Sequence, residues 1–290
     1  MKKPLLLWFT AFVVTAVSAY VQRVTGPTYP LRGEVLLGKL PIRYRLERSH
    51  SGSSEAFISI TIRDGSVFGV VRWRRLNSDD EWMFVPMTRE GDLLIAGVPG
   101  QPPSGKISYS VYLKRNSEEA VIPPDAPAVM RFKGEVPPLV LWVHICLMFL
   151  AMLLSTRTGL EYFAPGNDIK SLTYGTVALL TVGGMILGPV VQKYAFGAYW
   201  TGWPFGGDLT DNKTLLALLA WIAVASALKR SKRIRLWALA AALLTLAVYM
   251  IPHSVLGSEM DYREGADKKA VPSLAHGRAT QLLDIGRAVY

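Results

Sequence analysis

Long apolar runs alternate with polar stretches along this chain and predict where it crosses a membrane. Four runs lie in its second half, at residues 139–154, 172–191, 215–228 and 236–251. Each approaches the roughly 20 residues that an α-helix needs to span the hydrocarbon core. A fifth run, residues 4–20, follows Lys2 and Lys3 and has the character of a signal peptide or signal anchor. The pattern predicts a helical bundle of four spans over residues 138–257, preceded by a signal or anchor segment over residues 1–24.

Residues 25–137, between these two parts, follow a different pattern. Stretches rich in β-branched and aromatic residues recur at 57–62, 67–73, 82–87, 93–98 and 106–114, and turn-forming residues separate them. About six to eight short strands with a turn roughly every ten residues are typical of an all-β immunoglobulin-like sandwich. His50 falls in a polar loop between predicted strands. The predicted fold is therefore a membrane α-helical bundle joined to an immunoglobulin-like β-sandwich.

Basic residues predict how the chain is oriented in the membrane. The connection between the last two runs, residues 229–235, holds five Lys or Arg residues and should be cytoplasmic. Lys2 and Lys3 place the N-terminus on the same side. Counting spans from either signal puts the β-sandwich, the loop before residue 213 and a polar tail over residues 258–290 outside the cytoplasm. The expected location is a bacterial inner membrane, with these parts periplasmic.

Composition and charge exclude several classes of protein. Only 19% of the 290 residues are charged, and Cys146 is the sole cysteine, which excludes an internal disulfide and a C-x-x-C-H haem attachment. The net charge of +10 reflects membrane topology and anionic lipid more simply than nucleic acid. Arg72, Arg74 and Arg75 flank Trp73 on a predicted strand, where one solvated face explains them. No nucleic-acid partner is predicted, and the motifs of common enzyme classes are absent.

Two histidines and an aromatic loop are the candidates for chemistry. His144 lies about six residues into the first of the four spans, and His253 follows Pro252 at the end of the last. Ionisable residues in spans are candidate functional groups, and the predicted topology puts both histidines toward the outer side. The loop between them holds Tyr199, Trp200 and Trp203, followed by Asp208. Its rings suit a planar macrocycle such as haem b, for which imidazole is a standard axial ligand. The alternative is an interfacial aromatic belt, with Asp211 or Asn212 capping a helix that begins near Lys213.

The same loop resembles the tryptophan-rich signature of haem-handling membrane proteins of cytochrome c assembly, approximately W-G-x-Y-W-x-W-D-P-K-E-T. The positions that carry the resemblance are Phe196, Tyr199, Trp200, Trp203, Asp208, Lys213, Thr214 and Trp221. Phe196 replaces the first Trp, and four residues separate Trp203 from Asp208, which are adjacent in the signature. The resemblance implies that the loop cradles haem on the outer face, between His144 and His253 as axial ligands and with Trp200, Trp203 and Asp208 beside it.

Together these features predict a membrane protein that handles haem for cytochrome c assembly or carries b-type haem in a redox complex. Its expected partners are membrane lipid and either the subunits of a membrane complex or cytochrome c assembly and redox proteins. One alternative is a scaffold subunit without a catalytic role, whose β-sandwich binds a partner protein. Another is a copper site, because His144, Met148 and Met152 share one helical face and imidazole with thioethers suits Cu(I).

Overall fold

The computed structural model describes residues 3–164, 168–252, 260, 262 and 263. The chain divides into two compact units. One comprises Met1–Tyr29 and Glu135–Ser258 and is called the helical unit below; the other comprises Pro30–Gly134 and Glu259–Tyr290 and is called the β unit. His253, His276 and most of the predicted tail lie outside the described residues.

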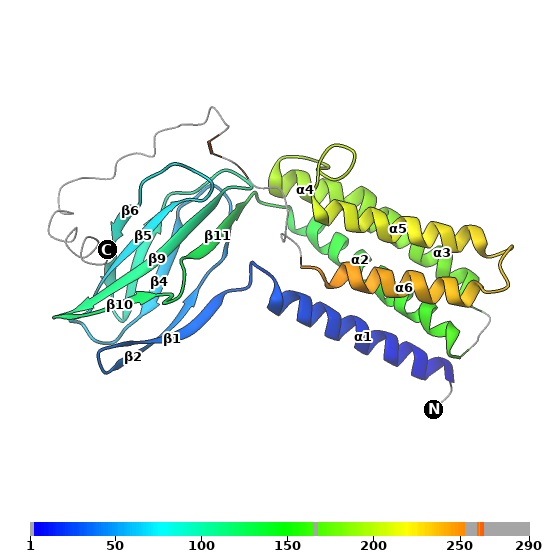
Figure 1. Ribbon diagram of the computed structural model, residues 1–290, viewed down its shortest axis with the longest axis horizontal. Coiled ribbons are helices and arrows are strands. Elements are labelled where there is room, and N and C mark those ends of the chain that lie inside the picture. The colour runs from blue at the N-terminus through cyan, green and yellow to red at the C-terminus, as the bar shows by residue number, and fades with distance from the viewer. Residues whose placement is uncertain (1–2, 165–167, 253–259, 261, 264–290) are drawn as a thin grey trace. The chain divides into compact units, whose positions relative to one another are not determined.

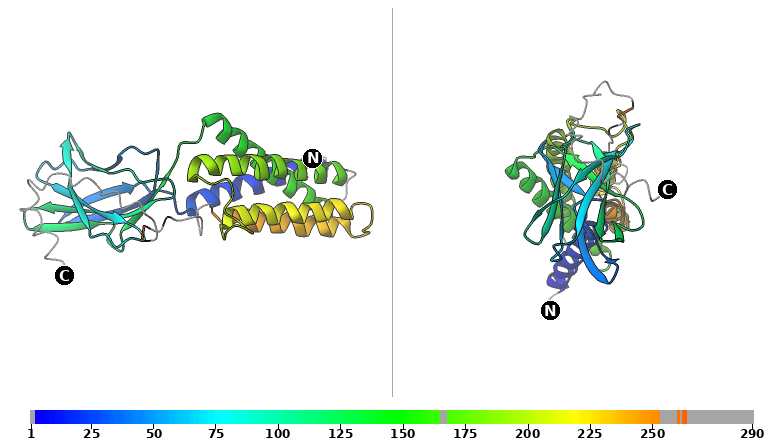
Figure 2. Two further views of the ribbon diagram at one scale, coloured as in Figure 1. Left: turned by 90° about the horizontal axis from the view of Figure 1, so that it is seen from above. Right: turned by 90° about the vertical axis from the view of Figure 1, so that its left-hand side faces the viewer.

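Helices make up the described part of the helical unit (Figures 1 and 2). They are α1 (Lys3–Thr25), α2 (Pro138–Gly159), η1 (Leu160–Tyr162), α3 (Ile169–Leu179), η2 (Leu180–Leu187), α4 (Gly188–Phe196), α5 (Leu209–Ala227) and α6 (Ile234–Met250). Among the described residues, three helical segments are long and apolar enough to cross a membrane, namely Pro4–Thr25, Pro138–Tyr162 and Ile169–Phe196. This confirms the predicted membrane helices at the coarse level.

The other two predicted spans correspond to α5 and α6. α6 has 17 residues and counts as a shorter apolar helix. α5 has 19 residues and carries Asp211 and Lys213 near its start. At 1.5 Å per residue, the two helices are about 26 and 28 Å long, close to the ~30 Å hydrocarbon thickness. That the bundle has four spans after the β unit stays a prediction.

Small residues and internal hydrogen bonds join these helices. α2 packs against α1, α3 and α6. A Cβ on Gly159 of α2 would lie 2.6 Å from the Cβ of Ala242 in α6, so the glycine permits this close approach. The buried Trp221 of α5 donates from Nε1 to Thr245 Oγ1 of α6 over 2.9 Å. α1 belongs to the same bundle, because Gln22 donates to the carbonyl of Tyr249 over 2.7 Å.

A buried ion pair extends α2 beyond the predicted apolar run. The run ends at residue 154, whereas the helix continues to Gly159. Arg157 and Glu161 lie one turn apart, are 3% and 0% exposed in their side chains, and form an ion pair. Trp8 of α1 lies under the Arg157 guanidinium, with its ring centre 5.5 Å away. The charge of Arg157 is paired inside the bundle, so the helix continues past it. The composition of the sequence, in which a charged residue marks the end of an apolar run, therefore predicts too early an end for α2.

The described part of the β unit has eleven strands in three sheets. Figure 1 shows these strands as arrows. A hairpin pairs β1 (Leu31–Leu37) with β2 (Leu40–Leu46), and a three-stranded sheet has the order β4 (Ala56–Thr61), β8 (Leu93–Val98), β7 (Thr88–Glu90). The largest sheet has the order β3 (Ser49–Ser51), β11 (Ala128–Lys133), β9 (Lys106–Arg115), β5 (Phe68–Arg75), β6 (Met83–Pro86), and β10 (Glu118–Ile122) also pairs with β9. The predicted β-rich domain is confirmed. The prediction for His50 is wrong, because it lies in β3, which pairs in parallel with β11.

One hydrophobic core joins the three sheets. In β4, buried and exposed residues alternate strictly, so Ala56, Ile58 and Ile60 point inward. Trp73 of β5 is 1% exposed and belongs to this core. Arg72 and Arg74 lie on the opposite face of the strand and stack on Trp82, with 4.1 and 4.6 Å from guanidinium carbon to ring centre. The interpretation of these arginines as one solvated face of a strand fits Arg74, which is exposed. It does not fit Arg75, whose side chain is 15% exposed and forms an ion pair with Asp80.

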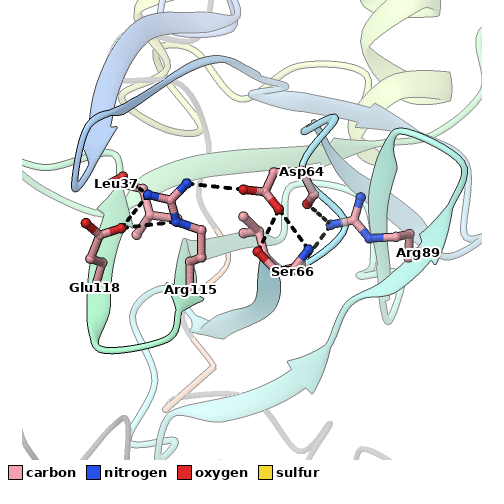
Figure 3. A network of polar contacts seen from close by, with 7 residues as sticks. Leu37, Asp64, Ser66, Arg89, Arg115 and Glu118 are labelled. Carbon is pink, nitrogen blue, oxygen red and sulfur yellow. Dashed lines mark hydrogen bonds and ion pairs between the residues drawn. The ribbon is translucent and has the colours of Figure 1, made fainter.

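A polar network fixes the turn between β4 and β5 (Figure 3). Asp64 accepts hydrogen bonds from the amide and hydroxyl of Ser66, over 2.9 and 2.6 Å, and forms a 3.1 Å ion pair with Arg115. These contacts, those with Ser66 foremost, lower the pKa of Asp64 to about 2. Arg115 also binds Glu118 over 2.6 Å, and Arg89 donates to the Asp64 carbonyl over 3.0 Å. The network links the turn to the β9–β10 hairpin and to β7.

The described residues after α6 return to the β unit. Met260 donates from its amide to Ser104, and Tyr262 donates from its amide to Asn77 over 3.1 Å. The Tyr262 ring lies 4.7 Å from the guanidinium carbon of Arg75. Burial raises the pKa of Tyr262 to about 12. Part of the predicted polar tail is therefore bound to the β unit.

Candidate functional site

A π-helical turn interrupts the third long apolar helix of the helical unit. η2 has π geometry over Leu180–Leu187, and at its end the amide of Gly188 donates to the carbonyl of Gly183, five residues earlier. Single π turns inside α-helices often occur at functional sites. Glycines make this turn fit its neighbours: a Cβ on Gly184 would lie 2.7 Å from Thr214 Cγ2 of α5. The turn is therefore a packed feature of the bundle.

His144 of α2 contacts this turn. Its side chain is half-buried, and Nδ1 lies 2.9 Å from the carbonyl oxygen of Gly183. Because a carbonyl can only accept, Nδ1 carries the proton, and in the neutral ring Nε2 keeps the lone pair. Within the described part of the chain, Nε2 has no hydrogen-bond partner. A histidine fixed through one nitrogen and open at the other is the usual arrangement of a metal ligand.

The two methionines of the proposed copper face have packing positions. The Met148 sulfur lies 3.3 Å from where a Cβ on Gly183 would be, so its thioether fills the notch that this glycine leaves. Met152 is 1% exposed. In the described residues, no group of three or more His, Cys, Asp and Glu side chains is placed to hold a metal ion. The packing of the two methionines explains their positions without a metal ion, whereas His144 is fixed by a hydrogen bond through Nδ1.

The aromatic loop is closed by carboxylates at the start of α5. α4 ends at Phe196; the next residue, Gly197, has a left-handed φ of 86°, and the chain then turns back toward α5. Asp208 is the N-cap of α5 and accepts from the Thr210 amide over 2.8 Å. One oxygen of Asp211 accepts from the amides of Thr201 and Gly202, over 2.7 and 3.0 Å. The interpretation of Asp211 or Asn212 as the helix cap is wrong, because α5 begins earlier, at Leu209.

The aromatic residues predicted to contact haem differ in their exposure once the loop is closed. Tyr199 and Trp203 are 59% and 70% exposed, as is Phe205 at 83%. Trp200 is half-buried and donates from Nε1 to the carbonyl of Trp203 over 3.1 Å. Asp208 is buried and committed to the loop. The Trp203 ring is therefore exposed, whereas Lys193 Nζ lies 5.4 Å from the centre of the Tyr199 ring. The Asp208 carboxylate has a local structural role.

Lys213 ties the end of α6 to the same end of the bundle. It is 6% exposed and donates from Nζ to the carbonyl of Ile251 over 2.6 Å. The end of α6 therefore lies beside the start of α5, next to the aromatic loop. His253, the second predicted ligand, follows two residues later and lies outside the described residues.

No protein-family model, no curated protein and no solved structure matches this chain. Its candidate site is therefore defined by its own residues. Sequence reasoning located His144, the loop and Lys213 but missed the π turn, the Gly183 carbonyl and the bond from Lys213 to Ile251. The close spacing of Gly183, Gly184 and Gly188 in an otherwise apolar helix was the available signal, because glycines and π turns accompany irregular helices.

Proposed function

We propose that this protein is an integral membrane protein that binds haem b at the outer face of a bacterial inner membrane. It would hold haem in transit for cytochrome c assembly or retain it in a redox complex. The observation that supports this best is His144, whose Nδ1 is bound to the Gly183 carbonyl and whose Nε2 is left open. When bound, haem would supply the redox and ligand chemistry of its iron.

The surrounding residues fit such a group. His144 offers a neutral imidazole nitrogen, the ligand type that haem iron takes in many proteins. A glycine lies beside the ring, with the Cε1 atom 3.9 Å from the Cβ position of Gly188. Tyr199 and Trp203 present exposed side chains on a loop that Asp211 and Asn212 hold in place. His253 is proposed as the second ligand, on the strength of the sequence alone.

The topology proposed with this function has α1, α2, the α3–α4 helix, α5 and α6 all crossing the membrane. The basic connection at residues 229–235 would then be cytoplasmic, and the aromatic loop, the β unit and the residues after α6 would be periplasmic. α1 would be retained as an anchor, because Trp8 and Gln22 contact Arg157 and Tyr249 of the bundle. The β unit would be an immunoglobulin-like sandwich that binds a partner protein of the membrane complex.

The test is the optical spectrum of the detergent-purified protein, oxidised and then reduced with dithionite. We expect a Soret band and a reduced α-band, which His144→Ala and His253→Ala each abolish or shift to a high-spin form. His50→Ala is the matched control, because His50 lies in the β unit and should leave the spectrum unchanged. A protein without these bands after reconstitution with hemin, or bands that survive His144→Ala, would rule out this haem site.

A second candidate is a scaffold subunit without a cofactor. The solvent-facing side of β5 favours it, because Arg74 stacks on Trp82 and Phe68 is 68% exposed, a mixture that suits a protein interface. In that case His144 would only join α2 to η2. His144→Ala would then destabilise the bundle without the loss of any absorbance band, whereas Arg74→Glu would weaken assembly with the partner subunit.

A further inference from the structure

We infer that the π turn at Leu180–Leu187 selects the nitrogen that His144 presents to its ligand. The Gly183 carbonyl accepts the Nδ1 proton, and the Cβ position of Gly188 lies 3.9 Å from Cε1, the ring atom between the two nitrogens. Nε2 therefore carries a lone pair and no proton. It can bind a ligand that accepts an electron pair, such as a metal centre, but it cannot donate a hydrogen bond to a ligand. The inference deepens the proposed function, on which it rests for the identity of the metal group.

The π turn brings two donors to one carbonyl. Gly183 O accepts the amide of Gly188 within its own helix and the Nδ1–H of His144 from α2. A carbonyl has two lone pairs, so both bonds can be made at once. In an uninterrupted α-helix, the amide four residues on would be the partner instead. The π turn thus belongs to the same hydrogen-bond unit as the histidine ring.

Gly183 has to be a glycine for this contact to form. A Cβ there would lie 2.9 Å from the Cβ of Leu147 and 3.3 Å from the sulfur of Met148. The Leu147 Cβ is attached directly to the α2 backbone and cannot swing away. Any larger residue at 183 therefore pushes η2 from α2, and the 2.9 Å bond to His144 lengthens. Gly183 is a positioning residue, which acts on a ligand only through His144.

Gly188 controls the open edge of the ring in a different way. Its Cβ position lies 3.9 Å from His144 Cε1 and 3.8 Å from Gly183 O, which are ordinary contact distances. An alanine at 188 is therefore tolerated. Cε1 is the atom between the two ring nitrogens, so a longer side chain at 188 would extend across the edge that carries Nε2. Gly188→Leu should block this edge and leave the Nδ1 bond intact.

The first experiment reads the tautomer without haem. The full-length, haem-free protein is labelled with ¹⁵N-histidine, and the signals of His144 are assigned by comparison with His144→Gln. We expect one protonated nitrogen, Nδ1, and one bare nitrogen, Nε2, near neutral pH. Gly183→Ala should convert this into a mixture of tautomers. Gly207→Ala, where a Cβ meets nothing within 4 Å, is the control and should change nothing. An Nε2–H tautomer, or a mixture in the unmodified protein, would overturn the inference.

The second experiment reads access to Nε2 with diethyl pyrocarbonate. The Nε2 lone pair attacks a carbonyl carbon of the reagent, and the Nδ1 proton goes to the leaving ethyl carbonate, which splits into ethanol and CO₂. Mass spectrometry should find His144 modified in the unmodified protein and in Gly188→Ala. We expect the modification to be lost in Gly188→Leu. Equal modification in Gly188→Leu would contradict the role of Gly188, whether or not the protein binds haem.

Hemin titration then separates this inference from the proposed function. Loss of a residue that orients a metal ligand typically weakens metal affinity by about 10–100-fold. We expect a loss of that size for Gly183→Ala, no binding for Gly188→Leu and unchanged binding for Gly188→Ala. If the tautomer and the modification behave as expected but hemin does not bind, the proposed haem function fails and the selection of Nε2 by the π turn stands.

Discussion

Gly38 and Gly91 provide a matched pair of substitutions in the β unit. Both have a φ of 60°, and they lie in the turns between β1 and β2 and between β7 and β8. An alanine in this left-handed conformation costs roughly 1–2 kcal/mol at either site. Their surroundings differ. A Cβ on Gly91 meets nothing within 4 Å, whereas a Cβ on Gly38 would overlap the carboxylate of Glu118.

We therefore expect Gly91→Ala to lower the free energy of unfolding of the β unit by about 1–2 kcal/mol, the cost of the backbone alone. For a domain of about 100 residues, each kcal/mol corresponds to roughly 4–8 °C in melting temperature. Gly38→Ala should lower it further, because Glu118 must leave Arg115, to which it is bound over 2.6 Å. Arg115 also binds Asp64, so the displacement loosens the turn between β4 and β5.

Hydrogen exchange of the full-length protein in detergent, followed by mass spectrometry, measures both changes in peptides that cover β9 and β10. The same pair of substitutions is then made in a Glu118→Ala background, which completes a double-mutant cycle. We expect the two alanine substitutions to cost the same in that background. If Gly38→Ala and Gly91→Ala already cost the same in the original protein, or if the excess survives without Glu118, the reasoning from the overlap is refuted.

Three further predictions concern other polar groups. The pKa of Asp64 is about 2, below the roughly 3.9 of an aspartate in an unfolded chain. The ionised carboxylate therefore contributes fully to stability above about pH 4, and this contribution is lost as the pH falls toward 2. Asp64→Asn should remove this step from an acid titration of β-unit unfolding. Trp221→Phe removes a buried hydrogen bond to Thr245 and should cost about 0.5–1.5 kcal/mol in an unfolding titration in mixed micelles, and an additive cost with Thr245→Val would count against that bond. Arg157→Met leaves the buried Glu161 carboxylate without the charge of Arg157, and should lower the free energy of unfolding by about 3–5 kcal/mol in the same assay. Adding Glu161→Leu to this variant should restore most of that loss.

The sequence predicts those parts of the fold that depend on local pattern. The alternation in β4 and the long apolar runs of α2 and the α3–α4 helix each mark an element regardless of what packs on it. The hairpin of β1 and β2 was missed, because Arg43 and Arg45 lie on its exposed face and dilute the hydrophobic signal. These two segments are strands because each hydrogen-bonds to the other. The amino-acid composition of a segment does not reveal such a pairing.

The candidate site was predictable only in its residue types. Histidine in an apolar run and a dense aromatic loop are visible in the sequence, but their hydrogen bonds join residues far apart along the chain, such as His144 and Gly183. Asp208 and Asp211 show the same limit at shorter range. Asp208 caps α5, whereas Asp211 accepts a hydrogen bond from the loop amide of Thr201. Sequence spacing did not distinguish these roles, because the position of the chain turn determines which carboxylate meets which amide.

The hydrogen bond from Lys213 to Ile251 has a consequence for how the protein is made. α5 and α6 are joined at one end by the basic connection and at the other by this buried bond, and Trp221 and Thr245 bind each other between the two ends. α6 is a shorter apolar helix, and α5 carries Asp211 and Lys213 near its start. When α5 and α6 are paired as a helical hairpin, each helix shields polar groups of the other from lipid. We therefore expect the insertion machinery to admit α5 and α6 together as one unit, so that a ribosome stalled before α6 leaves α5 outside the bilayer.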